Sequence, residues 1–269
     1  MLKNKTYNAL VIGCGNMGAL NDCKGSGNEH KTISYIKGLL EHGGFDIYCY
    51  DAVYEHEEYA SRIWNVKTHS VGMKYDVVII ATPDNTHYNE LKNITSNSPS
   101  LAICEKPLCS DFIEAKEIVE EYERLGIPLL VDYTRVFIPY WRDLKERYEK
   151  GEFGKLLDYY VSYNRGDLHT GTHATNFMDW FFKGEINNSL HFNHADHIPY
   201  RVWQIELFFE KKYISETRIG NMPVSDIYDN HTLHVIENAY NFLLGKEDLF
   251  CTGRDALRAL ELINNKQRG

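Results

Sequence analysis

Nowhere in its 269 residues does the sequence contain 18 consecutive apolar residues, so it lacks a segment typical of a membrane-spanning helix. The N-terminal stretch MLKNKTYNALVIG has too short an apolar segment for a signal peptide. No basic stripe offsets the carboxylates behind the net charge of -9, which argues against nucleic acid or an anionic membrane as a partner. The composition therefore predicts a cytoplasmic protein that acts on small molecules.

The sequence also lacks cysteine pairs at the spacing of a metal site, and several of its six cysteines lie in apolar runs, where they pack as small hydrophobic residues. This usage favours a reducing compartment. With 43% hydrophobic and 13% aromatic residues the chain can build a sizeable core, and its length suggests two domains. The cysteines are Cys14, Cys23, Cys49, Cys104, Cys109 and Cys251.

The first half of the chain alternates short apolar runs with amphipathic stretches, the pattern of βαβ units around a parallel sheet. Asp111 and Glu114 form a capping-box pattern that begins a helix, and Gly126 with Pro128 ends it. The expected buried strands are Tyr7–Ile12, Phe45–Tyr50, Val77–Ala81, Leu101–Cys104 and Pro128–Val131.

The pattern changes after about residue 131. A helix over YWRDLKERYEK is followed by the strand-like segments LLDYYVSYN, RVWQIELFF and KYISETRIG, separated by polar turns, and two further helices end the chain. We therefore expect an α/β protein with a first domain over residues 1–131 and a second over 132–269, whose open sheet is mostly antiparallel.

Gly13, Gly15 and Gly18 stand in G-x-G-x-x-G spacing directly after the first expected strand, with Asn16 and Met17 between them. This spacing suits a dinucleotide: the first glycine allows a tight turn, the second lets the backbone approach a pyrophosphate, and the third permits close helix packing. The triplet alone is a weak signal, because an ordinary strand-to-loop turn is also rich in glycine.

Asp51 ends the second expected strand, where an acidic side chain accepts hydrogen bonds from the adenosine ribose. It follows Gly18 at a longer interval than usual, which we ascribe to the loop NDCKGSGNE. No Lys or Arg nearby would hold a 2′-phosphate, so NAD is expected rather than NADP. The neighbouring Glu55, Glu57 and Glu58 equally suit a solvated helix face.

Several segments together resemble the glucose–fructose oxidoreductase, inositol dehydrogenase and MocA family (Gfo/Idh/MocA). The resemblance implies an N-terminal doubly wound Rossmann domain and a C-terminal α/β domain for substrate and oligomerisation, shortened here between Lys183 and Arg201. The segments are VIGCGNMG, HKTISYIKG, DVVIIATPDNTHYNEL, EKPLCSDFIEAKEIVEEYERLGIPLLVDYTRVFIP, GTHATNFMDW and HTLHVIENAYNFLLGKEDLFCTGRDALRALELI.

Glu105 and Lys106 follow a buried strand, at the end where a doubly wound sheet binds its ligand. Lys106 could orient a substrate hydroxyl beside the nicotinamide and stabilise a developing alkoxide, while Glu105 pairs with it or holds the backbone. Pro107 restricts Lys106 to extended geometry. A plain surface ion pair is the alternative. The resemblance also places Thr82 and Pro83 along the cofactor, with His87 either at the cofactor or capping or packing there.

His173 matches the family's catalytic histidine, and histidine has a proton affinity suited to a general base near neutral pH. Asn176, three residues later, shares its helix face. Many family members carry aspartate four residues before that histidine, where this chain has His169, and often aspartate at position 176. Tyr133 and Arg135 fit the family pattern and are expected at the substrate. Asp132 and Thr134 depart from it, and Arg135 could instead brace the domain junction.

His191, His194 and His197, with Asp196, could be read as a metal site. Spacing of three along a strand sends ligands to opposite faces, however, so a role beside the substrate pocket is favoured and no metal is expected. The aromatic residues of the second half suit, first of all, the core and a sheet face. The resemblance implies that this sheet face could also pair subunits into a homodimer or homotetramer.

The sequence thus predicts an NAD-dependent oxidoreductase that moves hydride between nicotinamide and a secondary alcohol or ketone on a sugar, cyclitol or nucleotide-sugar. A cofactor-binding regulator without turnover and an NAD-using, redox-neutral glycosidase are the alternatives. The retained Lys106 and His173 argue for an enzyme, whereas the altered His169 and Asn176 argue for the regulator.

Overall fold

A computed structural model describes residues 5–183, 193–220, 222 and 225–266. The chain forms two compact units: residues 1–134 with 229–257, and residues 135–228 with 258–269. None of the helices in the described part of the chain is long and apolar enough to cross a membrane.

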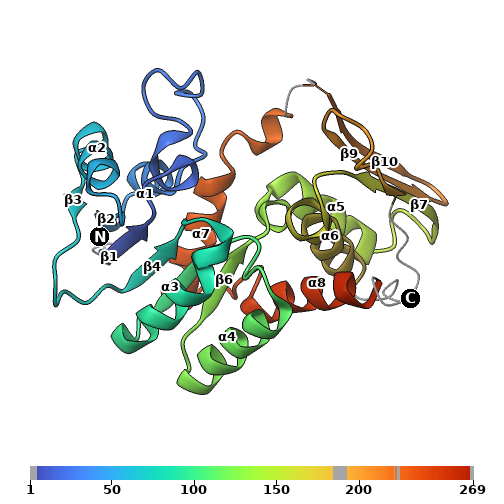
Figure 1. Cartoon of the computed structure of the whole chain (residues 1–269). Helices are drawn as coiled ribbons and strands as arrows, with labels where there is room; N and C mark the ends of the chain where they lie inside the picture. Colours follow the sequence, from blue (N-terminus) through green and yellow to red (C-terminus); the bar gives the residue numbers. More distant parts are fainter. Residues whose placement is uncertain (1–4, 184–192, 221, 223–224, 267–269) are drawn as a thin grey trace. The chain divides into compact units, whose positions relative to one another are not determined.

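The first unit is built on a parallel six-stranded sheet in the order β3-β2-β1-β4-β5-β6, which is the doubly wound Rossmann order (Figure 1). Its inner strands are almost continuously apolar, as expected when helices cover both faces of a sheet. The strands are β1 (Tyr7–Ile12), β2 (Phe45–Tyr50), β3 (Lys67–Thr68), β4 (Val77–Ile80), β5 (Leu101–Glu105) and β6 (Leu129–Asp132).

Local signals in the sequence set the helices of this unit. The Asp111 carboxylate caps α4 by accepting hydrogen bonds from the backbone N–H groups of Ile113 and Glu114, and Gly126 ends the helix in the left-handed conformation. The helices are α1 (Tyr35–His42), α2 (Tyr54–Trp64), α3 (His87–Ile94), α4 (Phe112–Leu125) and α7 (His231–Leu243).

The second unit carries a four-stranded sheet in the order β10-β9-β7-β8. β10, β9 and β7 pair antiparallel and the two-residue β8 pairs parallel to β7, so the expected mostly antiparallel sheet is confirmed. Aromatic side chains of α5 and α6 pack on one face of it. The elements are α5 (Pro139–Glu149), β7 (Leu156–Tyr163), α6 (Thr172–Phe182), β8 (Asn193–His194), β9 (Val202–Phe209) and β10 (Tyr213–Ile219).

The unit boundary differs from the expected division at residue 131. Residues 229–257 belong to the first unit, because α7 packs against α1, where Gly38 lies so close that a Cβ would stand 3.2 Å from the Thr232 side chain. α8 (Gly253–Lys266) begins in the first unit and continues in the second. The C-terminal helices that the sequence assigned to the second domain are therefore divided between the two.

Candidate functional site

The glycine turn after β1 has the packing that its spacing predicts. Gly13 has φ of 97°, and a Cβ there would stand 2.7 Å from the Ala81 carbonyl oxygen. A Cβ on Gly18 would stand 1.8 Å from the Gly13 oxygen, whereas one on Gly15 would meet no atom within 4 Å. Gly13 and Gly18 are thus required by the fold, and the open space at Gly15 is available to a ligand.

The helix expected to open at this turn is short. Asn16, Met17 and Gly18 lie in a single five-residue π turn, η1 (Asn16–Leu20). A loop over residues 21–34 separates this turn from α1, and the buried Asp22 carboxylate fixes the end of the loop by accepting a 2.8 Å hydrogen bond from the Ser34 N–H. This loop accounts for the long interval between Gly18 and Asp51.

Asp51 follows β2 and links the ends of two neighbouring strands. Its carboxylate accepts backbone hydrogen bonds from Cys14 at 2.7 Å and Val53 at 2.9 Å, and its side chain keeps 14% exposure. A carboxylate offers about four lone-pair sites, so acceptor capacity remains for ribose hydroxyls. His56, at 3.7 Å, is the basic side chain paired with it, and no lysine or arginine in the described chain is paired with it.

Thr82 and Pro83 follow β4, and His87 opens α3 behind them. The buried His87 ring places Nδ1 2.8 Å from the Pro107 oxygen and Nε2 2.9 Å from the Thr82 oxygen. Both ring nitrogens therefore face protein carbonyls. This geometry ties the loop after β4 to the loop after β5, and it favours a packing role for His87 over direct contact with a cofactor.

A buried cluster of three oxygen-bearing side chains lies at the ends of β5 and β6. Glu105 and Asp132 are register partners on these adjacent strands, so their side chains point to the same face. The hydroxyl of Tyr35, from α1, lies 3.0 Å from Glu105 Oε1 and 2.9 Å from Asp132 Oδ2. Tyr35 is fully buried, and Glu105 and Asp132 are 8% and 1% exposed.

Counting hydrogens shows that this cluster holds a proton. Tyr35 has one hydroxyl hydrogen and can donate it to only one carboxylate, so the second short contact is a hydrogen bond only when a carboxyl group is protonated. Burial and the Asp132 charge raise the pKa of Glu105 to about 7, and burial raises the pKa of Asp132 to about 6. The pair shares these two titrations because its members are coupled.

Lys106 is half-buried beside this cluster. Its backbone N–H donates to Glu105 Oε2 at 3.2 Å, and its ammonium lowers the pKa of Glu105 and of Asp132 against the larger effect of burial. The Lys106–Pro107 peptide is cis. One protonated carboxyl, one carboxylate and one ammonium leave the group electrically neutral, which avoids a buried unpaired charge.

Of these residues, the sequence singled out Glu105 and Lys106, whereas Tyr35 was missed. Tyr35 lies 70 positions from Glu105 and 97 from Asp132, and no local pattern marks it. Asp132 drew notice only as a departure from the family pattern.

The expected substrate residues fall in both units. Tyr133, in the first unit, is buried at the end of β6. Arg135, in the second, forms a two-pronged ion pair with Glu216 through Nε at 2.8 Å and Nη2 at 2.9 Å, and its guanidinium lies 3.8 Å from the Trp203 ring centroid. The Arg135 guanidinium is thus engaged by residues of its own unit, and both its substrate contact and its bracing of the domain junction stay predictions.

His169, His173 and Asn176 lie together at the start of α6. His173 is half-buried and Asn176 is 4% exposed, one helical turn apart as expected, while the exposed His169 lies in the preceding π turn over Asp167–Gly171. Their catalytic and binding roles stay predictions.

The histidine cluster falls largely outside the described residues. His191 and the side chain of His194 are among those not described, and His197 is exposed. Across the described ranges, no group of three or more His, Cys, Asp or Glu side chains could hold a metal ion.

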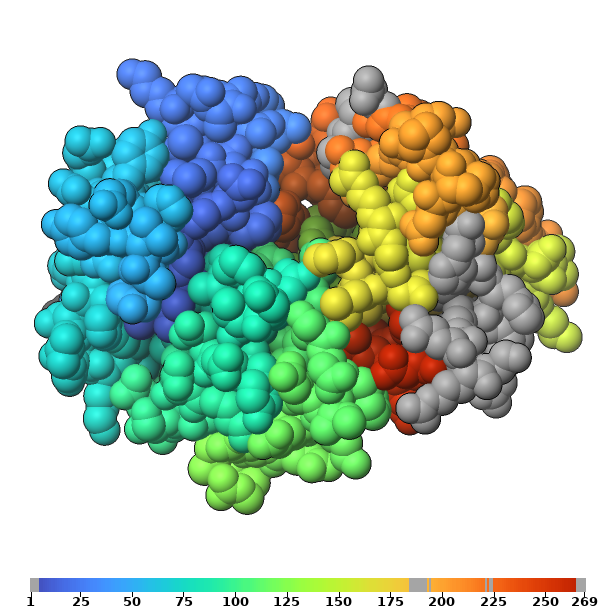
Figure 2. All heavy atoms as spheres, in the orientation of Figure 1, coloured from blue at the N-terminus to red at the C-terminus, as the bar shows by residue number. Residues whose placement is uncertain are grey.

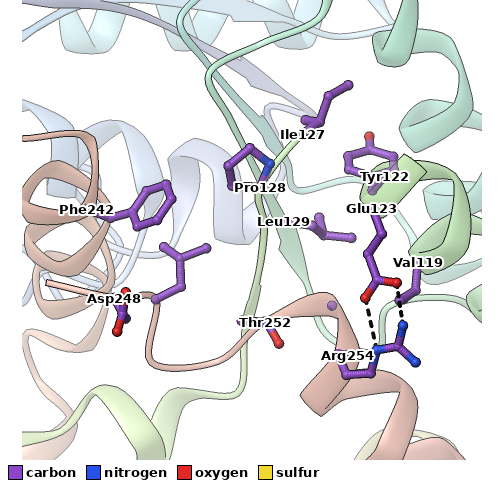
Figure 3. A pocket seen from close by; sticks show the side chains of 12 residues that line it. Val119, Tyr122, Glu123, Ile127, Pro128, Leu129, Phe242, Asp248, Thr252 and Arg254 are labelled. Carbon is purple, nitrogen blue, oxygen red and sulfur yellow. Dashed lines mark hydrogen bonds and ion pairs between the residues drawn. The ribbon is translucent and has the colours of Figure 1, made fainter. Parts of the chain in front are cut away.

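A cavity of about 420 Å³ lies at the other edge of the first sheet (Figure 3). Ile127, Pro128 and Leu129 line it at the start of β6, opposite the end that carries Asp132. Phe242 stands across from them, and the ion pair of Arg254 with Glu123 closes one side. Its place at the amino edge separates this cavity from the glycine turn, Asp51 and Lys106.

Residues 7–133 match a family model described as "Oxidoreductase family, NAD-binding Rossmann fold" (GFO_IDH_MocA). These residues, just under half of the chain, form a domain of the Gfo/Idh/MocA oxidoreductase type. The expected family, Rossmann fold and nicotinamide-binding domain are therefore confirmed.

The chain is also similar to several curated inositol dehydrogenases. The chain is 34% identical over 90 residues to scyllo-inositol 2-dehydrogenase (NAD(+)) of Bacillus subtilis strain 168, which covers 34% of this chain and 26% of that protein. It is 30% identical over 156 residues to an inositol 2-dehydrogenase of Corynebacterium glutamicum strain R, covering 57% and 44%. The matches thus span less than half of these relatives.

Solved structures share the fold of the whole chain. The WlbA dehydrogenase of Bordetella pertussis, in complex with NADH and UDP-GlcNAcA, has a TM-score of 0.74 at 15% identity and covers 100% of this chain and 97% of that one. GenD2 from gentamicin A biosynthesis, in complex with NAD, has a TM-score of 0.76 at 12% identity, covering 98% and 94%. At this identity the likeness establishes the fold alone.

Proposed function

We propose that the protein is an NAD-dependent oxidoreductase that transfers hydride between nicotinamide and a secondary alcohol or ketone of a sugar, cyclitol or nucleotide-sugar. The observation that carries this proposal is the convergence of the open glycine turn, Asp51 and Lys106 at the carboxyl edge of one parallel sheet, where doubly wound folds bind ligands. The family match and the inositol dehydrogenase relatives support it.

The residues of the first unit fit an NAD cradle. Gly15 leaves room for the pyrophosphate, and Asp51 keeps acceptor sites for the ribose hydroxyls. Among the described residues no lysine or arginine is paired with Asp51 to hold a 2′-phosphate. Asn16, Met17, Thr82 and Pro83 line the same edge of the sheet. Bound NAD would supply the hydride acceptor.

Side chains of this protein would orient and deprotonate the substrate hydroxyl. Lys106 orients the substrate hydroxyl and stabilises negative charge on its oxygen. His173 accepts the hydroxyl proton as general base, with His169, Asn176 and Tyr133 as pocket residues. The roles of these four residues rest on the family resemblance.

A regulator that binds the cofactor without turnover is the second candidate. It is favoured by His169 and Asn176, which stand where family members often carry aspartate.

Turnover separates the two candidates. Purified protein is screened for reduced-nicotinamide absorbance with NAD and NADP against sugars, cyclitols, uronates and nucleotide-sugars, beside Lys106→Ala. An enzyme turns over one substrate class and loses it in the variant, while Lys116→Ala, an exposed lysine on α4, leaves it unchanged. NAD binding without turnover on any class would instead favour the regulator.

A cytoplasmic location and a homo-oligomer complete the proposal. The face of the second sheet that points away from the aromatic core exposes large side chains, with Phe208 37% and Tyr213 53% accessible and their rings 5.1 Å apart. Such a face suits pairing between copies. Light scattering that gives a monomer mass at micromolar concentration would remove the oligomer from the account.

A further inference from the structure

Three arginines gather at one end of the sheet in the second unit. Tyr163 of β7, Trp203 of β9 and Arg218 of β10 stand in one row of register partners. Arg165 follows Tyr163 by two residues, and Arg201 precedes Trp203 by two residues on the antiparallel neighbour, so both lie just beyond that row. In Figure 2 the yellow chain that follows β7 and the orange chain of β9 and β10 reach the surface next to each other.

The backbone around Arg201 is held on both sides. The buried Asn164 side chain donates from Nδ2 to the Tyr200 oxygen at 2.6 Å and accepts from the Val202 N–H at 2.9 Å. The Gly220 N–H donates to the Arg201 carbonyl oxygen at 2.7 Å. These hydrogen bonds fix the backbone on both sides of Arg201 at the end of the sheet.

The backbone of Arg165 is held by a different set of contacts. It adopts φ of 72°, an unfavourable conformation for a residue with a Cβ, and the Asp196 carboxylate accepts hydrogen bonds from its N–H at 2.8 Å and from the Gly166 N–H at 3.3 Å. The Asp196 carboxylate thus holds the backbone of Arg165 at the end of the sheet, and the Arg165 side chain is exposed.

None of these three guanidinium groups forms an ion pair within the described residues, although the Glu216 charge acts on Arg201 and Arg218. Arg218 Nε is buried and has no acceptor, and Glu216, the acidic residue of the same strand, is already engaged by Arg135. Burial and the charges of Arg218, Arg165 and Arg135 lower the pKa of Arg201 to about 10. A buried, unsatisfied donor among repelling cations is costly unless an anion joins it.

We propose that Arg165, Arg201 and Arg218 form a binding site for an oxyanion, a carboxylate or a phosphate, carried by the substrate. The planar guanidinium fork matches the two oxygens of either group, and an anion placed here satisfies Arg218 Nε and relieves the repulsion. As a statement about substrate class this rests on the proposed dehydrogenase function, but anion binding itself can be measured without turnover.

The test is calorimetric titration of the full-length protein, with and without NADH, at constant ionic strength. Glucuronate and glucose 1-phosphate are compared with glucose and myo-inositol, and inorganic phosphate serves as an oxyanion without a sugar. We expect at least one charged sugar to bind about tenfold or more tightly than the neutral ones, and added salt to weaken it. Equal affinity of neutral and charged sugars, or no binding of any anion, overturns the inference.

Variants locate the site. Arg201→Gln and Arg218→Gln should each weaken anion binding by about 10- to 100-fold, since each removes a charged hydrogen bond. Arg62→Gln, which changes an exposed arginine on α2, should leave it unchanged. An equal loss in Arg62→Gln contradicts the assignment. Should the glutamine variants unfold, Arg201→Lys and Arg218→Lys keep the charge and should retain partial affinity.

The experiments distinguish a failure of the arginine site from a failure of the proposed oxidoreductase function. NAD-dependent oxidation of a neutral sugar without anion binding would sustain the proposed function and remove the arginine site. Anion binding that Arg218→Gln abolishes, with no turnover on any substrate, would sustain the site and leave the oxidoreductase in question.

Discussion

One tyrosine hydroxyl lies between two buried carboxyl groups at the ends of β5 and β6. Tyr35 lies within 3.0 Å of two carboxyl groups, and its one hydrogen cannot serve both. The folded protein therefore retains a proton that the unfolded chain releases at lower pH. Stability and pH are linked through this cluster.

The sign of that linkage follows from the raised pKa values of Glu105 and Asp132, about 7 and about 6. Stabilisation by the protonated cluster is fully present below the unfolded values near 4 and is lost as pH rises through 6 to 7. In wild type the free energy of unfolding should fall as pH rises through this range. Replacing Asp132 with asparagine should reduce that fall by about 2 kcal/mol, since the two carboxyl groups titrate as a coupled pair.

Urea unfolding at pH 5 and pH 8 measures this effect. The free energy of unfolding of wild type should fall more between these pH values than that of Asp132→Asn. Asp111→Asn, at the N-cap of α4 where asparagine caps as well as aspartate, is the matched control and should follow wild type. Parallel pH dependence of wild type and Asp132→Asn would exclude the shared proton.

At the scale of elements, local signals fixed most of the fold. The five strands expected in the first half appear within one residue of their expected ends, because each is an apolar run bounded by turn residues. β3 consists of two exposed residues at the sheet edge and has no apolar run. The π turn η1 has only five residues, which is too short to show a helical periodicity in the sequence. Short elements escape pattern reading for this reason.

The glycine turn yields a matched pair of substitutions. Gly18→Ala would force a Cβ to 1.8 Å from the Gly13 oxygen and should destabilise the protein by about 3 kcal/mol or more, whereas Gly15→Ala meets no atom within 4 Å and should change stability by less than about 1 kcal/mol. Thermal unfolding compares the two, and NADH fluorescence titration should show weaker binding for the folded Gly15→Ala. Unchanged NADH affinity in Gly15→Ala would remove this turn from the cofactor site.

The Arg135–Glu216 pair joins the turn after β6 to β10 in the second unit. Although burial opposes ionisation, the Arg135 cation lowers the pKa of Glu216, so the pair is charged. Glu216→Gln leaves an uncompensated guanidinium and should cost about 3 kcal/mol of stability. Denaturant unfolding tests this, with Glu152→Gln, which breaks an exposed pair to Arg147, as control. Equally small losses of stability in both variants would show that the Arg135–Glu216 ion pair does not stabilise the second unit.

At the scale of the whole molecule, the sequence predicted the family, the parallel sheet of the first unit and the mostly antiparallel sheet of the second. It did not predict which distant segments of the chain are in contact. The return of residues 229–257 to the first unit, the reach of Tyr35 to Glu105, and the meeting of Arg165, Arg201 and Arg218 all depend on tertiary packing. Spacing along the chain carries no information about such contacts.

The central claim is that NAD binds at the carboxyl edge of the first sheet with Asp51 on its ribose. Fluorescence titration of wild type and Asp51→Ala with NADH and NADPH tests it most directly, with Asp46→Ala, an exposed aspartate on β2, as control. We predict that wild type prefers NADH, and that Asp51→Ala weakens NADH binding by about tenfold or more while affecting NADPH less. Equal losses for both nucleotides, or no loss for either, would contradict the account.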